Sequence, residues 1–169
     1  MTANALIAAA RRLKLMAFDV DGVLTDGRLY YSANGETMKV FHVHDGQGLK
    51  QLAADGISLA LITGRQSDMV LSRARELGIT HVIQGREDKA VALAALAAEL
   101  GVEQSACGYA GDDLPDVPAL EWAALAFSVP NGQHCARTAA DHVTSRGGGD
   151  GAVREICDFI LAARHPETP

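Results

Sequence analysis

Short apolar runs alternate with longer amphipathic stretches along most of the chain. Most of these runs stop at Asp, Thr, Gly or Pro, which is typical of strands buried in a parallel sheet. The expected strands are Leu15–Phe18 (within Leu13–Val20), Ile57–Ile62, Ile79–Ile83, Ala106–Ala110, Ala124–Val129 and His142–Thr144. The expected helices are Thr2–Arg12, Gly48–Ala54, Gln66–Leu77, Asp88–Leu100 and Asp150–Ala163. Strand alternating with helix predicts an α/β fold, a Rossmann-like three-layer sandwich with a mainly parallel sheet.

The segment Gly27–Val43 breaks this alternation. Two β-rich arms flank Asn34-Gly35, the strongest short-range hairpin signal. We therefore expect a projecting hairpin over residues 27–43, inserted between the first strand and the first crossover helix. A lone two-stranded hairpin is marginally stable and has unpaired edges, so we expect it to pack against copies of itself in a homo-oligomer. Its apolar side chains are Leu29, Tyr30, Val40, Phe41 and Val43.

Three smaller features carry expectations of their own. Asp45 is the expected N-cap of the helix over Gly48–Ala54. His42 and His44 alternate along one hairpin arm and so share a face; an exposed or interface role is favoured over a metal pair, because a third ligand is missing. The three glycines of Gly147–Gly149 predict a mobile joint.

Composition narrows the class of protein. The 169 residues are 48% hydrophobic and 21% charged, which predicts a single domain over residues 1–169 with a sizeable core. The net charge of −6 argues against a nucleic-acid partner. The longest clean apolar run, Leu59–Ile62, is too short to span a membrane, and the N-terminal arginines follow the apolar stretch, unlike those of a signal peptide. We expect a cytoplasmic protein without a membrane partner.

The cysteines agree with that compartment. Cys107, Cys135 and Cys157 are odd in number and their spacing matches no zinc pattern. We therefore expect free thiols in a reducing environment.

Polar side chains stand where the expected strands end. These groups are Asp19-Val20-Asp21-Gly22 after the first strand, Thr63-Gly64-Arg65 after the second, Lys89 after the third, and Gly111-Asp112-Asp113 with Asp116 after the fourth. In open α/β sheets the ligand binds outside the carboxyl ends of the strands. We therefore expect all of these residues to meet at one crevice.

The chemistry of this set predicts phosphoryl transfer. Clustered carboxylates repel one another unless a cation joins them, and oxygen ligands suit Mg²⁺. Lys89, in the first turn of a helix, opposes the helix dipole, so we expect it to neutralise a phosphate oxygen or hold a carboxylate ionised. The Thr63 hydroxyl and backbone N–H groups such as that of Gly64 can take further phosphate oxygens. Asp19 is then the nucleophile and Asp21 the acid/base.

The surrounding residues have expected roles too. Asp112 is favoured as a metal ligand, with Asp113 behind it as a supporting or capping acid. Asp116 is expected to orient Lys89 or a metal-bound water. Arg65 either meets the carboxylate or hydroxyls of a substrate or is a surface residue.

This order of motifs resembles the haloacid-dehalogenase superfamily of aspartate-nucleophile phosphatases. The resemblance runs from about Leu15 to Val143. Within the superfamily the chain is similar to capless enzymes of lipopolysaccharide precursor synthesis, whose substrate is 3-deoxy-D-manno-octulosonate 8-phosphate. The matching segments are 19–27, Asn34-Gly35, 44–48, 62–65, 78–79 and 146–155.

The resemblance implies an aspartyl-phosphate on Asp19. It implies Mg²⁺ held by the carboxylates of Asp19 and Asp112 and by the backbone carbonyl of Asp21. It also implies a homotetramer in which the hairpins form a barrel and a tail segment reaches a neighbour's site. Gly85-Arg86-Glu87-Asp88 departs from the family's short polar stretch and leaves Arg86 without an assigned role.

Several alternatives stay open beside this interpretation. Taken singly, the Asp19 motif is a strand-end turn, Thr63 a helix cap and Lys89 a solvated surface lysine. A receiver domain of a response regulator also uses Asp, Thr and Lys at strand ends, but its lysine comes last, whereas Lys89 precedes Asp112. A non-catalytic phosphatase-like oligomerisation module would not need the intact acidic set. A nonulosonate 9-phosphate is a second candidate substrate.

Overall fold

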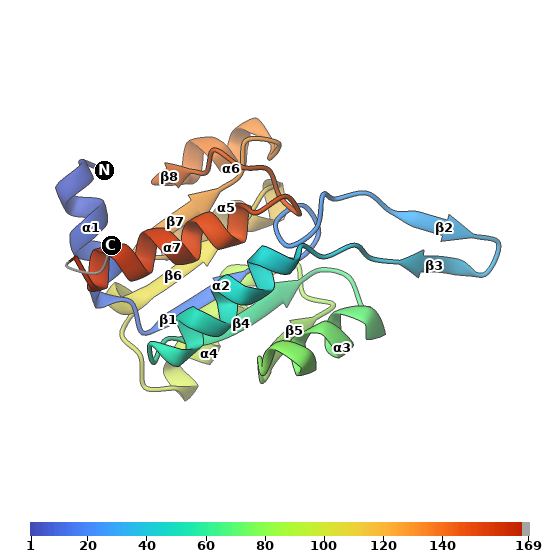
Figure 1. Ribbon diagram of the computed structural model, residues 1–169, viewed down its shortest axis with the longest axis horizontal. Helices are drawn as coiled ribbons and strands as arrows, with labels where there is room; N and C mark the ends of the chain where they lie inside the picture. The colour runs from blue at the N-terminus through green and yellow to red at the C-terminus, as the bar shows by residue number, and fades with distance from the viewer. Residues whose placement is uncertain (167–169) are drawn as a thin grey trace.

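A six-stranded sheet forms the middle layer of the protein, seen here in a computed structural model that describes residues 1–166 (Figure 1). Its strand order is β5-β4-β1-β6-β7-β8, and every pairing is parallel. The strands are β1 (Leu15–Phe18), β4 (Ser58–Thr63), β5 (His81–Gln84), β6 (Cys107–Ala110), β7 (Leu125–Ser128) and β8 (His142–Val143). All six lie within one or two residues of their predicted positions.

Helices cover both faces of this sheet (Figure 1). One layer contains α1 (Ala3–Arg12), α2 (Val43–Ala54), α3 (Asp68–Leu77) and α7 (Ala152–Arg164), and the other contains α4 (Lys89–Glu99), α5 (Val117–Trp122) and α6 (His134–Ala139). Side chains alternate along β1: Met16 and Phe18 enter the first core, Leu15 and Ala17 the second. The predicted Rossmann-like three-layer sandwich is confirmed.

The chain changes direction across the sheet at β1. From β1 it passes through α2 to β4 and then through α3 to β5 on one side, and α4 carries it back to β6 on the other side of β1. The carboxyl ends of β1, β4 and β6 therefore border the switch point where open α/β sheets bind ligands. Residues that follow these strands are brought together there.

A two-stranded hairpin extends away from this body (Figure 1). Its strands are β2 (Tyr30–Ser32) and β3 (Gly35–Met38), which pair antiparallel in a sheet of their own. The predicted hairpin is confirmed, but its second arm ends at Met38 rather than Val43. Val43 is the first residue of α2 and not part of the hairpin.

The start of α2 corrects two expectations. His42 is the N-cap, and its Nδ1 accepts the N–H of His44 at 3.2 Å, so these histidines do not alternate along a strand. Asp45 lies inside the first turn, buried, where its Oδ1 accepts the N–H of Arg154 at the start of α7 at 2.8 Å. The prediction began α2 too late because Gly46 and Gly48 weaken the helical signal, which packing against α7 overrides.

The expected mobile joint at Gly147–Gly149 is wrong. Gly149 N–H donates to the carbonyl of Val23 at 3.1 Å, and a Cβ on Gly148 would lie 1.8 Å from the carbonyl oxygen of Gly22. Glycine allows the segment to pack directly on the loop that follows β1 of the same chain. The short helices α5 and α6 were not predicted, because six residues are too few to show helical periodicity.

Two further observations concern the cysteines and the lengths of the helices. Cys107, Cys135 and Cys157 all lie in the described part of the chain and carry free thiols. Within residues 1–166 we find no helix of the length and apolarity that a membrane span requires.

Asp55 ties the end of α7 to the base of the sheet, and it supplies a stability prediction. Its carboxylate contacts Arg164, whose Nη1 donates to the carbonyl of Leu13 at 3.1 Å. Burial raises the pKa of Asp55, but hydrogen bonds from His165 and Arg164 lower it by more, to below its ordinary 3.8. We expect Asp55→Asn to reduce the free energy of unfolding by about 1 kcal/mol at pH 7.

The pH dependence of this difference follows from the lowered pKa. A carboxyl with a depressed pKa in the folded state stabilises above its unfolded pKa and loses that contribution as pH falls through the folded value. Urea unfolding at pH 7 and pH 3 should show the Asp55→Asn deficit shrinking in acid. Asp158→Asn, which removes an exposed i,i+4 pair, is the control with the smaller effect. An equal deficit at both pH values would contradict the assignment.

Candidate active site

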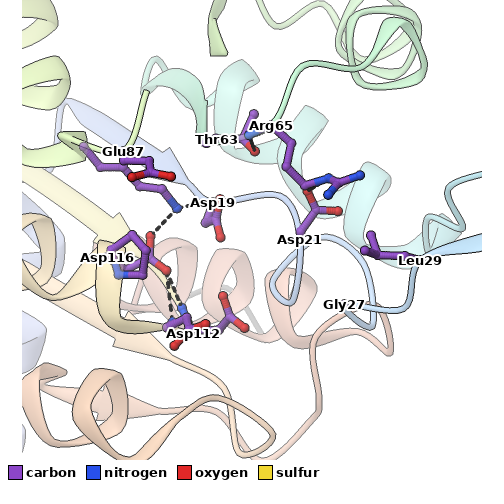
Figure 2. Close-up of a pocket in the computed structure, with 13 residues that line it drawn as sticks. Asp19, Asp21, Gly27, Leu29, Thr63, Arg65, Glu87, Asp112 and Asp116 are labelled. Atoms are coloured by element: carbon purple, nitrogen blue, oxygen red, sulfur yellow. Dashed lines mark hydrogen bonds and ion pairs between the residues drawn. The ribbon is translucent and has the colours of Figure 1, made fainter. Parts of the chain in front are cut away.

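A cavity of about 370 Å³ opens at the carboxyl ends of β1, β4 and β6 (Figure 2). Every residue that the sequence proposed for the site lies in its wall. The wall is made by Asp19, Asp21, Gly27, Leu29, Thr63, Gly64, Arg65, Glu87, Lys89, Asp112, Asp113, Pro115 and Asp116. Leu29, Gly27, Glu87 and Pro115 were not proposed, and Leu29 brings the base of the hairpin to the rim.

Lys89 is buried at the first position of α4. Its Nζ lies 2.9 Å from Asp19 Oδ1 and 2.7 Å from Asp116 Oδ1. Burial lowers the pKa of Lys89, but the two carboxylates raise it by more, so the ammonium stays charged. The interpretation of Lys89 as a solvated surface lysine is therefore wrong.

Asp116 holds the inner wall of the cavity together. Besides Lys89, its carboxylate accepts the hydroxyl of Tyr109 at 2.7 Å and the N–H groups of Asp112 and Asp113 at 3.0 Å each. Burial and the neighbouring Asp116 raise the pKa of Tyr109 well above its ordinary range, so its hydroxyl remains a donor. Tyr109 was missed by the sequence analysis, because a tyrosine within an apolar strand gives no sign that it donates to an acid.

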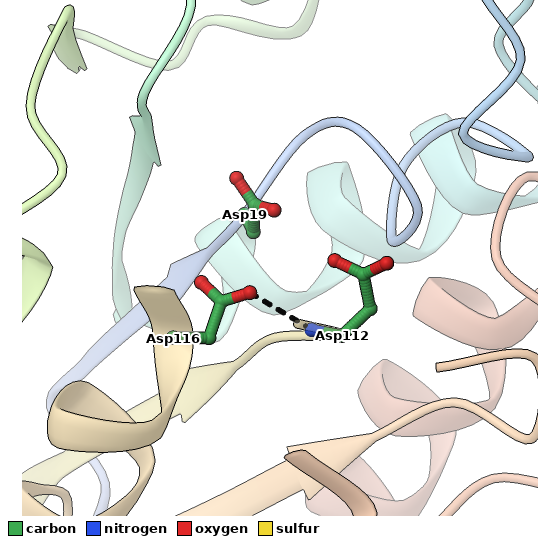
Figure 3. Close-up of side chains that lie close together, drawn as sticks. All are labelled: Asp19, Asp112 and Asp116. Carbon is green, nitrogen blue, oxygen red and sulfur yellow. Dashed lines mark hydrogen bonds between the residues drawn. The ribbon is translucent and has the colours of Figure 1, made fainter. Parts of the chain in front are cut away.

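Three carboxylates crowd the floor of the cavity (Figure 3). Oxygens of Asp19, Asp112 and Asp116 lie within 4.8 Å of one another. Burial and the charge of Asp116 raise the pKa of Asp19 well above its usual range, and the same two causes raise the pKa of Asp112 to about 7. The cluster is thus short of positive charge.

This donor set fits Mg²⁺. The four donors on Asp116 already occupy its oxygens, which leaves the carboxylates of Asp19 and Asp112 facing one another. Oxygen donors of this kind suit a hard divalent cation, which relieves their mutual repulsion. Glycine at position 22 allows the loop after β1 to lie close to the Asp112 carboxylate, because its φ is +99° and a Cβ there would lie 2.0 Å from Asp112 Oδ2.

The other proposed residues have clear local partners. The buried Thr63 hydroxyl accepts the N–H of Arg65 at 3.3 Å; because α3 starts at Asp68 with Ser67 as its N-cap, Thr63 is not a helix cap. Asp113 caps the next turn by accepting the N–H of Leu114 at 2.7 Å. Arg86 lies outside the cavity wall, where its guanidinium pairs with Asp88 at 2.6 Å.

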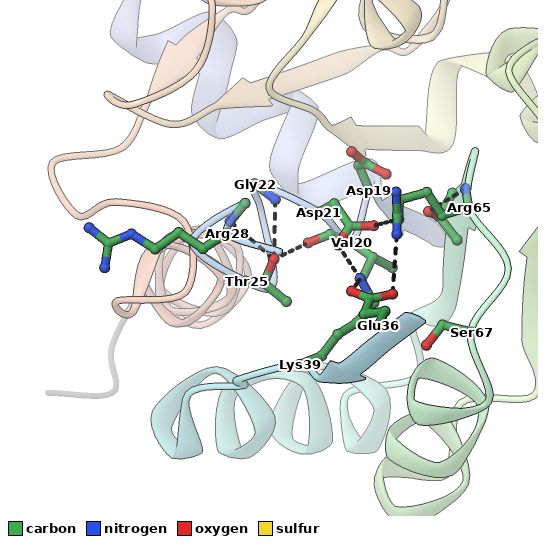
Figure 4. Close-up of polar contacts among 12 residues, drawn as sticks. Asp19, Val20, Asp21, Gly22, Thr25, Arg28, Glu36, Lys39, Arg65 and Ser67 are labelled. Atoms are coloured by element: carbon green, nitrogen blue, oxygen red, sulfur yellow. Dashed lines mark hydrogen bonds and ion pairs between the residues drawn. The ribbon is translucent and has the colours of Figure 1, made fainter. Parts of the chain in front are cut away.

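The hairpin brings two further charged residues to the site (Figure 4). Lys39 contacts the carboxylate of Asp21 and lies 3.0 Å from Glu36 Oε1. Glu36 Oε2 accepts a hydrogen bond from Arg65 Nη2 at 3.2 Å, and Tyr31 accepts one from the same nitrogen at 3.1 Å. Burial raises the pKa of Glu36, but hydrogen bonds from Lys39 and Arg65 lower it by more. Arg65 is thus anchored at the rim.

Thr25 shapes the loop that carries Asp21. Its hydroxyl oxygen accepts the N–H groups of Gly22 at 3.3 Å and Gly27 at 3.2 Å. Thr25, Glu36 and Lys39 were not predicted from the sequence to belong to the site. Thr25 lies within the motif over residues 19–27, whereas Glu36 and Lys39 lie in the hairpin, where only the apolar side chains were assigned a role.

Comparison with known proteins places this site in a class of hydrolases. Residues 78–156 match a family described as haloacid dehalogenase-like hydrolase. The chain is 42% identical over 159 residues to the 3-deoxy-D-manno-octulosonate 8-phosphate phosphatase KdsC of Escherichia coli (strain K12), covering 94% of this chain and 85% of that protein. These figures are high enough to define a family and not only a fold.

Solved structures agree with the sequence match. The crystal structure of 3-deoxy-D-manno-octulosonate 8-phosphate phosphatase from Moraxella catarrhalis, in complex with magnesium, phosphate and KDO, is similar with a TM-score of 0.95 and 49% identity, over 97% of this chain and 94% of that one. The cobalt-bound enzyme from Haemophilus influenzae is similar with a TM-score of 0.90 and 41% identity, over 93% and 92%. The chain belongs to the 3-deoxy-D-manno-octulosonate 8-phosphate phosphatase family of haloacid dehalogenase-like hydrolases.

The acidic cluster predicts that Mg²⁺ stabilises the folded protein. We expect saturating Mg²⁺ to raise the Tm by about 5 °C, because a ligand that binds only the folded state shifts the unfolding equilibrium. Asp112→Asn should abolish the shift, while its Tm without metal stays equal or higher because a repulsive charge is gone. Asp113→Asn, whose carboxylate caps a turn, should keep the shift. Differential scanning fluorimetry with and without EDTA measures all three; a full shift in Asp112→Asn would contradict the site.

Proposed function

We propose that this protein is a Mg²⁺-dependent phosphatase that hydrolyses 3-deoxy-D-manno-octulosonate 8-phosphate through an aspartyl-phosphate on Asp19. The observation that carries the proposal is the buried contact of Asp19 with Lys89, with Asp21 two residues further on in the same cavity. Family membership supports the substrate, since the related enzymes carry it in their names.

In the first step Asp19 attacks phosphorus and the bond to the sugar oxygen breaks. Asp21 gives its proton to that leaving oxygen. The Lys89 ammonium stabilises charge on the transferring group, and the Thr63 hydroxyl and Gly64 N–H bind its remaining oxygens. Asp19, Asp112 and the backbone carbonyl of Asp21 would hold Mg²⁺, which would supply further positive charge there.

In the second step the roles of the two acids separate. The Asp21 carboxylate now takes a proton from water, and the water oxygen attacks phosphorus. The bond between phosphorus and the Asp19 oxygen breaks, which releases inorganic phosphate and restores both acids. Asp116 keeps Lys89 beside Asp19 throughout, and Asp113 holds the turn that presents Asp112.

Arg65 is proposed to bind the carboxylate or hydroxyls of the sugar acid. Its side chain lines the cavity and is 39% exposed at the rim. A guanidinium of this kind suits a carboxylate. A nonulosonate 9-phosphate presents the same groups and remains the second candidate. The receiver-domain and non-catalytic alternatives lose support, because the chain belongs to a phosphatase family and keeps Lys89 paired with Asp19.

A phosphate-release screen over sugar phosphates, with Mg²⁺ or EDTA, tests this function. We expect the octulosonate 8-phosphate to give the highest kcat/KM and EDTA to abolish turnover. Asp19→Asn should lose at least about 10³-fold in kcat, since it removes the nucleophile. Asp26→Asn, an exposed acid of the same loop, is the matched control. Near wild-type turnover in Asp19→Asn would contradict the mechanism. A higher kcat/KM for a nonulosonate 9-phosphate would show that this compound is the preferred substrate.

We further propose that residues 1–169 form one domain that works as a cytoplasmic homotetramer. The hairpin supports self-association, because the apolar side chains of Leu29, Tyr31, Met38 and Val40 are each about half exposed or more. The free thiols and the net charge of −6 are compatible with a reducing compartment and with a small-molecule partner rather than a nucleic acid.

Light scattering tests the assembly. We expect a mass about four times the 17.8 kDa chain. Val40→Glu, combined with Met38→Glu, should lower the mass by placing charge in the contact. Val91→Glu, at an exposed apolar residue on α4, should leave it unchanged. A monomeric wild-type protein would contradict the proposal.

A further inference from the structure

Lys39, at the end of an exposed hairpin, has a buried side chain. Its side chain is 1% exposed, whereas the neighbouring Met38 is 47% exposed. Lysine is almost never fully buried unless it is paired. Here the ammonium contacts Asp21 Oδ1 and lies 3.0 Å from Glu36 Oε1, so the hairpin inserts a cation beside the proposed acid/base of its own chain (Figure 4).

Glu36 and Arg65 complete a ring of alternating charges around Asp21. The Glu36 side chain is 10% exposed, lies beside Lys39 and accepts a hydrogen bond from Arg65 Nη2 at 3.2 Å. Arg65 Nε in turn lies 3.8 Å from Asp21 Oδ2, which is beyond hydrogen-bond distance. Two cations therefore compete for Asp21, and Lys39 makes the closer contact.

The two oxygens of Asp21 are consequently unequal. Oδ1 is bound by Lys39, and Oδ2 is buried without a hydrogen-bond partner among residues 1–166. Asp21 lines the cavity, whereas Lys39 does not. The ion pair thus restrains rotation of the carboxylate and leaves Oδ2 as the oxygen to which no group in the described part of the chain donates.

We propose that Lys39 is a positioning residue for Asp21, and that Glu36 positions Lys39, so that the hairpin orients the acid/base of its own subunit. The inference rests on the proposed function, in which Asp21 moves a proton in both steps. Without Lys39, the nearest cation is Arg65, and the carboxylate turns toward it. Oδ2 is then engaged at the rim, and both proton transfers slow while substrate binding is retained.

A double-mutant cycle between Lys39 and Asp21 tests this. Lys39→Met should lower kcat by about 10–100-fold, part of what general acid–base catalysis contributes, with KM within about 2-fold. Because water activation also slows, intact-mass spectrometry after rapid quench should show phosphoenzyme accumulating, as in Asp21→Asn. In the Asp21→Asn background, Lys39→Met should change the residual rate by less than about 2-fold, since the group it orients is already gone.

Companion variants separate positioning from folding. Lys39→Arg keeps the charge and should recover part of the lost kcat, and Lys50→Met, at an exposed lysine on α2, should match wild type. Glu36→Gln keeps the Lys39–Asp21 contact and should show a smaller loss that also vanishes in Asp21→Asn. If thermal melting shows that Lys39→Met does not fold, Glu36→Gln replaces it in the double-mutant cycle.

The outcomes also distinguish this inference from the proposed function. The cycle is run with p-nitrophenyl phosphate as well as with the sugar phosphate. The result with p-nitrophenyl phosphate tests the positioning role even if the natural substrate has been assigned wrongly. An equal loss from Lys39→Met in the wild-type and Asp21→Asn backgrounds, or an unchanged kcat in Lys39→Met, overturns the positioning role. If Asp19→Asn loses all activity but the effects of Lys39→Met and Asp21→Asn are additive, the phosphatase function is supported and the positioning role of Lys39 is contradicted.

Discussion

The active site depends on one buried cation held between two carboxylates at the end of the central strand. Lys89 begins a helix whose dipole opposes it, and burial further disfavours its charge. Asp19 and Asp116 offset both costs at 2.9 and 2.7 Å. The remaining donors on Asp116 then fix the loop of Asp112 and Asp113 around this pair. An acidic cluster so poor in positive charge is prepared for a metal ion and a phosphoryl group.

A second layer of charge surrounds this inner pair. Asp19 and Asp112 face the floor of the cavity, and Asp21 stands toward the hairpin, where Lys39 and Arg65 approach it from different elements. The inner cation belongs to the sheet-and-helix body, and the outer cation Lys39 comes from the hairpin. The hairpin contributes both to the rim, through Leu29, and to the surroundings of the proposed acid/base Asp21, through Lys39, and so connects the shape of the opening with the charges inside it.

Much of the site could be read from the sequence because parallel strands end at one edge. Asp19, Thr63, Lys89 and Asp112 follow different strands, and βα topology alone brings them together. Strand positions were equally clear, since apolar runs bounded by Gly or Pro are strong local signals. The start of α2 was misplaced because its glycines hide a helix that contact with α7 stabilises. Gly147–Gly149 was expected to be mobile for a similar reason. In a sequence, glycine indicates backbone freedom, whereas in this fold the missing side chains allow close packing.

Sequence patterns alone predict the class of fold, the order of the motifs and an acidic crevice suited to a metal ion. These follow from local patterns and from residue chemistry, which do not depend on distant neighbours. Which groups come together is seen only in the three-dimensional structure: Asp116 beside Tyr109, Gly148 against the Gly22 carbonyl, and Lys39 beside Asp21. Gly148 and Gly22 are far apart along the chain, and the geometry of all three contacts depends on how the loops, hairpin and helices pack on the sheet, which no local pattern encodes.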